Sequence, residues 1–152
     1  MKLDIGSAEG PMPADYIHLD IQREYVYATA EELGYKPVDI IADAHYLPFR
    51  DGVFDEVYSG NCVLVYTGKR AFDEAVRVLK PKGKLVLHII ASYVPMAIIE
   101  AGKRHKLKWI DIEPVNHEID GEIFDVKLTF RKERLTNDWF FDDLRKPDIE
   151  YL

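Results

Sequence analysis

KLDIGSAEGP, residues 2–11, is the stretch that decides how the rest of the chain is organised. An apolar strand over residues 3–5 runs directly into a turn that contains Gly6 and Gly10. Glycine can adopt positive φ, and it lets backbone amides approach a ligand with no Cβ in the way. In an open α/β sheet such a turn lies at the carboxyl end of a strand, where ligands bind. The stretch therefore indicates a ligand site, although an ordinary strand-to-loop turn also fits a lone glycine pair.

The composition is typical of one globular domain. Of the 152 residues, 47% are hydrophobic and 31% are charged, and a chain of this length buries about 70% of its unfolded surface. The net charge of −7 argues against general nucleic-acid binding, because phosphate contacts need a basic face. The single cysteine, Cys62, excludes an internal disulfide and favours the reducing cytoplasm. The histidines lack metal-ligand spacing and no apolar run approaches a membrane span, so we expect neither a metal nor a membrane partner.

Strand and helix patterns alternate along the chain. Strands are predicted over residues 3–5, 16–21, 38–42, 54–59 and 84–90, helices over 24–33, 69–79 and 94–102, and an antiparallel pair over 107–112 and 123–131. Pro81 and Gly83 are expected to end the second helix. Residues 84–90 are almost continuously apolar, so we expect a central strand with Leu85, Val86 and Leu87 buried. The order predicts an α/β three-layer sandwich with a mostly parallel sheet.

The connection between the first two predicted strands is short. Pro11 and Pro13 leave no room for a helix before the strand that begins at Tyr16. A parallel crossover normally needs about a dozen residues. We therefore expect the chain either to pass directly across the sheet edge or to pair in an unusual way.

Asp20 stands where the second strand should end. A carboxylate at that point can accept both hydroxyls of a ribose, although a helix cap or a solvated loop acid is the more usual explanation of such a residue taken alone. His18, in the middle of the same strand, is expected to be packed rather than to act as a base. The tip of the second strand thus becomes a candidate nucleoside contact.

Five blocks in the right order and at the right intervals resemble the class I S-adenosylmethionine-dependent methyltransferases of the type 11 group. They are LDIGSAEG (3–10), HLD (18–20), ADAHYLPF (42–49), FDEVYS (54–59) and AVRVLKPKGKL (75–85). The short first loop is similar to a variant of that family without the first crossover helix. The resemblance implies a Rossmann-like sheet of order 3-2-1-4-5-7-6 with an antiparallel seventh strand. We also expect the N-terminal helix that covers the site in related proteins to be absent, because the first strand begins at Leu3.

The resemblance implies S-adenosylmethionine as the cofactor and assigns roles to the matching positions. The methionine end of the cofactor would be surrounded by Asp4, Gly6, Ser7, Ala8 and Gly10. Asp20 would take the ribose hydroxyls and Ile21 would lie against the adenine. Asp43 would accept the adenine amino group, and Ala44 would present its backbone amide. The methyl-transfer cleft would be lined by Ser59, Gly60 and Asn61.

Two departures from the family pattern concern the chemistry. Ala8 replaces the glycine that usually gives the backbone its closest approach to the ligand. Leu64, Val65 and Tyr66 occupy the region where related sequences often carry a histidine, so no acid–base residue is inherited. Methyl transfer needs position and a dry cleft rather than a protein nucleophile, and we assign no catalytic residue.

Three functions from different classes remain open. The first is a methyltransferase with an unidentified acceptor, either a small molecule or a protein. The second is a non-catalytic binding or regulatory protein that keeps the fold. An NAD-dependent oxidoreductase is disfavoured, because Ala8 interrupts the G-x-G-x-x-G spacing of a dinucleotide site.

Residues 1–134 are expected to form the methyltransferase-like domain, and residues 135–152 an irregular tail that contains Trp139, Phe140 and Phe141. Without the first crossover helix, part of the sheet beside the first two strands should be left with uncovered apolar surface. We therefore expect a homodimer or a partner subunit to cover this surface, with a tail folded back on its own sheet as the alternative.

Overall fold

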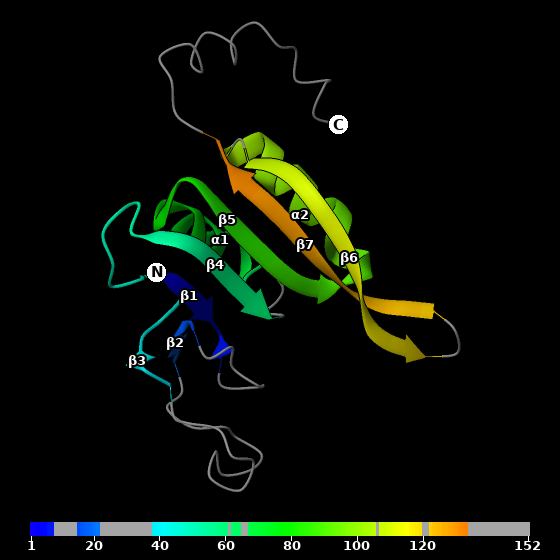
Figure 1. Cartoon of the computed structure of the whole chain (residues 1–152), viewed down its shortest axis with the longest axis horizontal. Coiled ribbons are helices and arrows are strands. Elements are labelled where there is room, and N and C mark those ends of the chain that lie inside the picture. The colour runs from blue at the N-terminus through cyan, green and yellow to red at the C-terminus, as the bar shows by residue number, and fades with distance from the viewer. Residues whose placement is uncertain are drawn as a thin grey trace, which may run out of the picture.

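The computed structural model describes residues 1–7, 15–21, 38–60, 62–64, 67–105, 107–119 and 122–133. The strands are β1 (Lys2–Ile5), β2 (Ile17–Asp20), β3 (Ile40–Ile41), β4 (Phe54–Gly60), β5 (Leu79–Ile90), β6 (Leu107–Ile119) and β7 (Glu122–Lys132). They form one sheet in the order β3-β2-β1-β4-β5-β7-β6 (Figure 1). β7 runs antiparallel to β5 and to β6, and the other pairs are parallel. The predicted fold class and strand order are confirmed.

The first two strands pair in the ordinary parallel way despite their short connection. Leu3 is the partner of Ile17, and Ile5 is the partner of Leu19. A further backbone bond, from the Gly6 amide to the Leu19 carbonyl at 2.9 Å, continues this pairing into the turn. Residues 8–14 lie outside the described residues. The expected alternative of an unusual pairing is therefore wrong.

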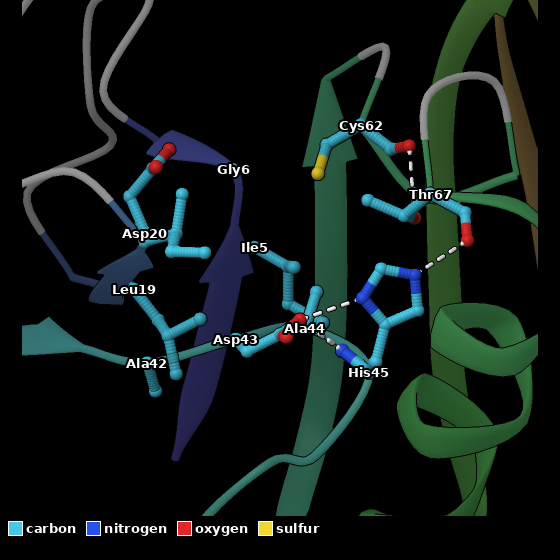
Figure 2. A pocket seen from close by; sticks show the side chains of 11 residues that line it. Ile5, Gly6, Leu19, Asp20, Ala42, Asp43, Ala44, His45, Cys62 and Thr67 are labelled. Carbon is cyan, nitrogen blue, oxygen red and sulfur yellow. Dashed lines mark hydrogen bonds and ion pairs between the residues drawn. The ribbon is translucent and has the colours of Figure 1, made fainter.

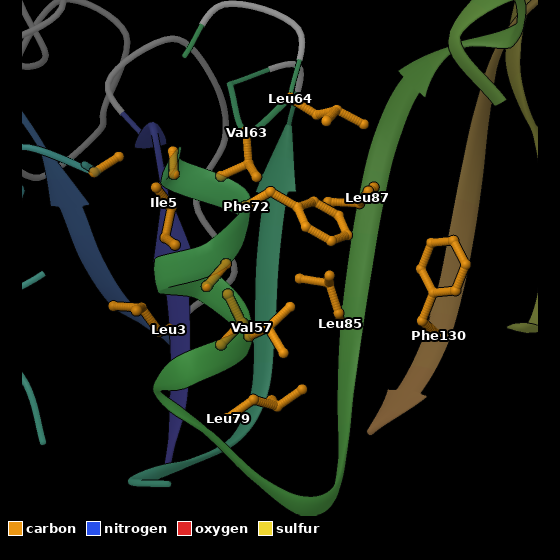
Figure 3. Close-up of a cluster of buried hydrophobic side chains, with 14 of the residues drawn as sticks. Leu3, Ile5, Val57, Val63, Leu64, Phe72, Leu79, Leu85, Leu87 and Phe130 are labelled. Carbon is orange, nitrogen blue, oxygen red and sulfur yellow. The ribbon is translucent and has the colours of Figure 1, made fainter. Parts of the chain in front are cut away.

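The two described α-helices, α1 (Gly68–Arg77) and α2 (Val94–Glu100), lie behind the sheet in the view of Figure 1. The apolar stripe of α1 buries Phe72 against the side chains that the strands send toward it (Figure 3). Leu85 and Leu87 of β5 are fully buried there, and so is Val57 of β4. Each such side chain contributes about 1.5–3 kcal/mol through burial. This face of the sheet is the core of the protein. Val86 points to the opposite face and is also buried, so the prediction is confirmed for all three residues of β5.

The alternate residues of the same strands point to the opposite face, which we call the open face. The open face carries a groove of about 540 Å³, lined by Tyr16, Glu56, Tyr58, Lys84, Val86, Ile110, Asp111, Glu113, Lys127 and Thr129. None of the described helices lies over this groove (Figure 1). Most of its side chains are polar. The groove contains no residue of β1 or β2, so the apolar surface expected beside the first two strands stays a prediction. The helix predicted over residues 24–33 and the tail over residues 135–152 lie outside the described residues.

Several boundaries differ from the prediction. α1 ends at Arg77 and β5 begins at Leu79, whereas the helix was predicted to continue to Leu79. Val78 and Leu79 are apolar and buried, and such residues fit the buried side of a helix as well as a buried strand. Pro81 and Gly83 therefore do not end a helix; they belong to a bulge in β5, where the register jumps from Phe54–Leu79 to Glu56–Lys84. β3 has only two residues. β6 is longer than predicted, and a bulge between Trp109 and Asp111 interrupts the alternation of apolar and polar residues that the prediction used. α2 ends at Glu100, and a single π-turn, Ala101–His105, follows it.

Candidate cofactor-binding site

A cavity of about 150 Å³ opens at the carboxyl ends of β1, β2 and β3, next to the loop that follows β4 (Figure 2). Its walls are formed by Ile5, Gly6, Leu19, Asp20, Ile21, Ala42, Asp43, Ala44, His45, Cys62 and Thr67. Five of the residues predicted to bind the cofactor, Gly6, Asp20, Ile21, Asp43 and Ala44, are thus brought together. The structure places them where ligands bind in open α/β sheets.

Gly6 has two separate reasons to be glycine. Its φ is +78°, in the left-handed region that side chains disfavour. A Cβ at this position would also lie 2.3 Å from the Cβ of Cys62. The turn after β1 therefore packs directly against the loop after β4, and the cavity lies beside this contact.

Two carboxylates face the cavity from different walls. Asp20 ends β2, and its backbone carbonyl accepts a hydrogen bond from the Ala42 amide at 2.9 Å, which holds the segment after β3 beside it. Asp43 follows β3, and its Oδ1 accepts hydrogen bonds from the His45 backbone amide at 2.8 Å and from His45 Nδ1 at 2.6 Å. These bonds lower the pKa of Asp43, the backbone bond most strongly. Asp43 is therefore an ionised acceptor at neutral pH.

His45, Cys62 and Thr67 also line the cavity, and sequence reasoning did not assign them to the cofactor. His45 contacts the Thr67 carbonyl oxygen through Nε2 at 2.9 Å. The bond to Asp43 and then the bond to Thr67 raise the pKa of His45. His45 belongs to the ADAHYLPF block and could have been found there. Cys62 and Thr67 come from the loop after β4, and only the fold brings them to this wall.

Four predicted residues are not part of the cavity wall: Asp4, Ser7, Ser59 and Gly60. The Ser7 hydroxyl is buried and donates to the Leu19 carbonyl at 3.4 Å. Ser59 accepts a hydrogen bond from the Val63 amide at 2.9 Å and so orders the turn after β4. The remaining three, Ala8, Gly10 and Asn61, lie outside the described residues.

Asp4 and His18 form a buried polar pair between β1 and β2. His18 Nδ1 lies 3.2 Å from Asp4 Oδ2, and the His18 side chain is fully buried, as expected for a packed histidine. Burial raises the pKa of Asp4 to about 6, and the His18 ring opposes part of this rise. Within the described part of the chain, His18 Nε2 has no hydrogen-bond partner.

A second polar group crosses the open face from β4 to β7. The Tyr58 hydroxyl lies 3.4 Å from His88 Nδ1, and His88 Nε2 lies 3.0 Å from Asp125 Oδ2. Burial raises the pKa of Tyr58, with a smaller contribution from Asp4. The group lies beside the tip of β4, because a Cβ on Gly60 would be 3.6 Å from the Tyr58 hydroxyl. The alternation pattern does not reveal it, since its members come from three strands.

Among the residues that the structure describes, no three His, Cys, Asp or Glu side chains gather in a way that could hold a metal ion. No described helix is both long and apolar enough to cross a membrane.

The sheet order and the cavity at the tips of β1 to β3 define a protein of the class I methyltransferase fold. A family model described as "Methyltransferase domain" matches residues 3–87, more than half of the chain. The chain therefore belongs to the methyltransferase domain family. None of the curated protein sequences matches it.

Solved structures show the same fold at low sequence identity. A 1,6-didemethyltoxoflavin-N1-methyltransferase from Burkholderia thailandensis, solved with S-adenosylhomocysteine, has a TM-score of 0.65 and 15% identity over 88% of this chain and 71% of that chain. A SAM-dependent methyltransferase from Aquifex aeolicus has a TM-score of 0.61 and 15% identity over 86% and 81%. The cyclase SpnF has a TM-score of 0.58 and 19% identity over 87% and 74%. At these identities the likeness concerns the fold alone.

Proposed function

We propose that this chain is an S-adenosylmethionine-dependent methyltransferase with an acceptor that remains to be identified. The observation that carries the proposal is the pair of carboxylates, Asp20 and Asp43, on two walls of a cavity that begins at Gly6. Ribose hydroxyls and the adenine amino group are hydrogen-bond donors, and ionised carboxylates accept from them. Membership of the methyltransferase domain family supports the same cofactor.

Each wall of the cavity has a role in this proposal. Asp20 takes the ribose hydroxyls, and Ile21, whose side chain is 65% exposed, is free to cover the adenine. Asp43 uses Oδ1 for His45, and the proposal places the adenine amino group on Oδ2. The positive φ of Gly6 and its close contact with Cys62 leave no room for a side chain at position 6, which keeps the turn after β1 against the loop after β4.

When bound, S-adenosylmethionine supplies a methyl group on a positively charged sulfur, and in-line transfer needs no nucleophile from the protein. The chain itself has to position the two reactants and to exclude water. For an acceptor that must lose a proton, we propose His88 as the base, because it pairs with Gly60 at the tip of β4. Asp125 faces Nε2 and so favours the ring form in which Nδ1 keeps a lone pair toward Tyr58.

A second candidate function is binding or other chemistry without methyl transfer. Two observations favour it: no acid–base residue is inherited from the family, and a cyclase shares the fold. Both candidates predict that S-adenosylhomocysteine binds, and only the first predicts that S-adenosylmethionine loses its methyl group to an acceptor.

Titration calorimetry with S-adenosylhomocysteine tests the proposal. Hydrogen bonds to a charged group are worth about 1.5–3 kcal/mol, so Asp20→Ala should weaken binding about 10- to 100-fold. Asp51→Asn is the matched control, because Asp51 is an exposed acid that pairs with Arg77 away from the cavity. NAD should not bind. Unchanged affinity in Asp20→Ala would reject the ribose role, and no binding by the wild type would reject the proposed cofactor.

A further inference from the structure

His45 lies between two oxygen atoms that can only accept hydrogen bonds (Figure 2). Nδ1 is 2.6 Å from a carboxylate oxygen of Asp43, and Nε2 is 2.9 Å from the carbonyl oxygen of Thr67. A neutral imidazole carries one N–H, so one of its nitrogens would turn a lone pair toward an oxygen. Both contacts are hydrogen bonds only when both nitrogens carry a proton. The geometry is that of an imidazolium.

The two partners of His45 belong to different walls of the cavity. Asp43 follows β3, and Thr67 ends the loop between β4 and α1. The Thr67 amide and hydroxyl are each 3.2 Å from the Cys62 carbonyl oxygen, and Cys62 packs against Gly6. The His45 ring therefore connects the acid proposed to hold the adenine with the wall that meets the glycine turn.

We propose that protonated His45 is a positioning residue of the cofactor site, which holds the Asp43 carboxylate and the Thr67 loop in the arrangement that binds an adenine nucleoside. Cofactor binding is then coupled to a proton on His45. This inference rests on the function proposed above. It adds a residue to the site and gives the affinity a pH dependence of known sign.

The charged and titratable groups around the ring favour its proton on balance. Asp43 attracts the proton, while Arg70 of α1, whose Nε donates to the His45 carbonyl at 3.1 Å, opposes it. Asp20 and Cys62 line the same cavity. The pKa of His45 is raised, chiefly by its bond to Asp43. Below this raised pKa the binding form is fully populated, and the affinity falls as the pH rises through it.

Loss of the proton has a definite structural effect. If Nδ1 keeps its hydrogen, the Nε2 lone pair faces the Thr67 carbonyl; if Nε2 keeps its hydrogen, the Nδ1 lone pair faces the Asp43 carboxylate. One wall of the cavity is then no longer held. Asp43 keeps the His45 backbone amide as a donor, so we expect weakened binding rather than none.

The test is calorimetry with S-adenosylhomocysteine on the full chain between about pH 6 and pH 9, where an unperturbed or raised histidine titrates. Wild-type affinity should fall about fivefold or more across this range, since a charge-assisted hydrogen bond is roughly twice as strong as a neutral one. His45→Gln, which carries no titrating proton, should bind more weakly at low pH and show little pH dependence. His105→Gln is the matched control: His105 Nε2 lies 2.7 Å from Asp73 outside the cavity wall, so this variant should keep the wild-type slope.

A wild-type affinity that does not change with pH, or a slope that persists in His45→Gln, would overturn the inference. A readout without ligand separates this failure from failure of the proposed function. Nitrogen NMR of the free chain should show both His45 ring nitrogens protonated at about pH 6, below the ordinary pKa of histidine, and Asp43→Asn should lower the pH at which they titrate. A neutral ring in the free wild type refutes the positioning role, whereas a protonated ring without S-adenosylhomocysteine binding refutes only the cofactor.

Discussion

The two faces of the sheet are built from alternate residues of the same strands and have opposite chemistry. On one face, Leu3, Val57 and Leu85 are completely buried beneath the described helices (Figure 3). On the open face, hydrogen bonds and ion pairs replace apolar packing. Tyr16 bonds to Glu56, and Lys127 lies 3.5 Å from Glu113.

This difference explains how the described part of the open face is stable with none of the described helices over it (Figure 1). A doubly wound sheet needs two helical layers because both of its faces are apolar. Here the described open face satisfies its side chains with one another, as Tyr58, His88 and Asp125 do. The described polar side chains on the open face of β4, β5 and β7 are therefore paired with one another.

The largest expected effect separates the two faces on one strand. Leu85→Ala, on the helix side of β5, should lower the free energy of unfolding by about 2–5 kcal/mol, because it leaves a cavity in the core. Val86→Ala, on the open side, should cost about 1–2 kcal/mol at most, because it removes about two methylene equivalents beside a groove. Urea unfolding of both variants measures the difference. Equal losses would show that the open face is packed like the core.

The next effect concerns the strand tips, where both faces end. Gly6→Ala should lower stability by at least about 2 kcal/mol, since it adds a collision with Cys62 to the cost of positive φ. Gly68→Ala is the matched control, because its φ is +68° and a Cβ there meets no atom within 4 Å. It should cost only about 1–2 kcal/mol. If thermal unfolding shows the same loss of stability in both variants, the close contact between Gly6 and Cys62 does not contribute to the effect of Gly6→Ala.

A third effect tests the buried acid of the open face. The folded pKa of Asp4 is about 6, above its ordinary value of 3.8. Well below pH 3.8 the carboxyl is protonated in both states and costs nothing. As the pH rises from about 4 to about 6, the unfolded state releases the proton first, so the folded state loses about 1–3 kcal/mol of stability. Asp4→Asn should remove this loss, as measured by urea unfolding at the two ends of the range. Asp111→Asn, at an exposed position on β6, should retain it, and an unchanged slope in Asp4→Asn would assign the pH dependence elsewhere.

The smallest effect asks whether anything covers the open face. Lys127→Gln breaks an exposed ion pair and should change stability by less than about 1 kcal/mol in a monomer. The homodimer expected from the sequence stays a prediction. An interface on the open-face groove would be formed mostly by polar side chains. Light scattering of the wild type and of Lys127→Gln at micromolar concentration distinguishes a monomer from a homodimer. A mass of one chain contradicts the dimer, and a dimer that Lys127→Gln dissociates would place the interface on this face.

Much of the fold could be predicted because it depends on order and apolar runs. Two strands could be placed from the glycine turn after Leu3–Ile5 and from the apolar run at Leu85–Leu87. The order of the strands in the sheet was implied by the family resemblance. The end of α1 could not be predicted, because Val78 and Leu79 are apolar and buried, and this fits a helix as well as a strand. The polarity of the open face was missed for a different reason. Alternation shows that a strand has two faces, but not which neighbours satisfy the polar one.

The residues of the candidate site, like the elements of the fold, could be predicted only in part. Asp20 and Asp43 could be predicted because each acid stands at a strand tip in a recognisable block. The places of His45 and Thr67 in the cavity wall could not, since they depend on a contact between the loops after β3 and β4. Asp4 was assigned to the cofactor from its place beside the glycine turn. The structure shows that its described partner is His18, across β1 and β2.

A crystal structure with S-adenosylhomocysteine tests the central claim most directly. We predict adenine in the cavity between Asp20 and Asp43, the ribose hydroxyls on the Asp20 carboxylate, and the amino group on the Asp43 oxygen that His45 does not use. The homocysteine end should pass the Gly6 turn toward the tip of β4. A ligand that binds in the open-face groove instead, or one that touches neither acid, would contradict the account.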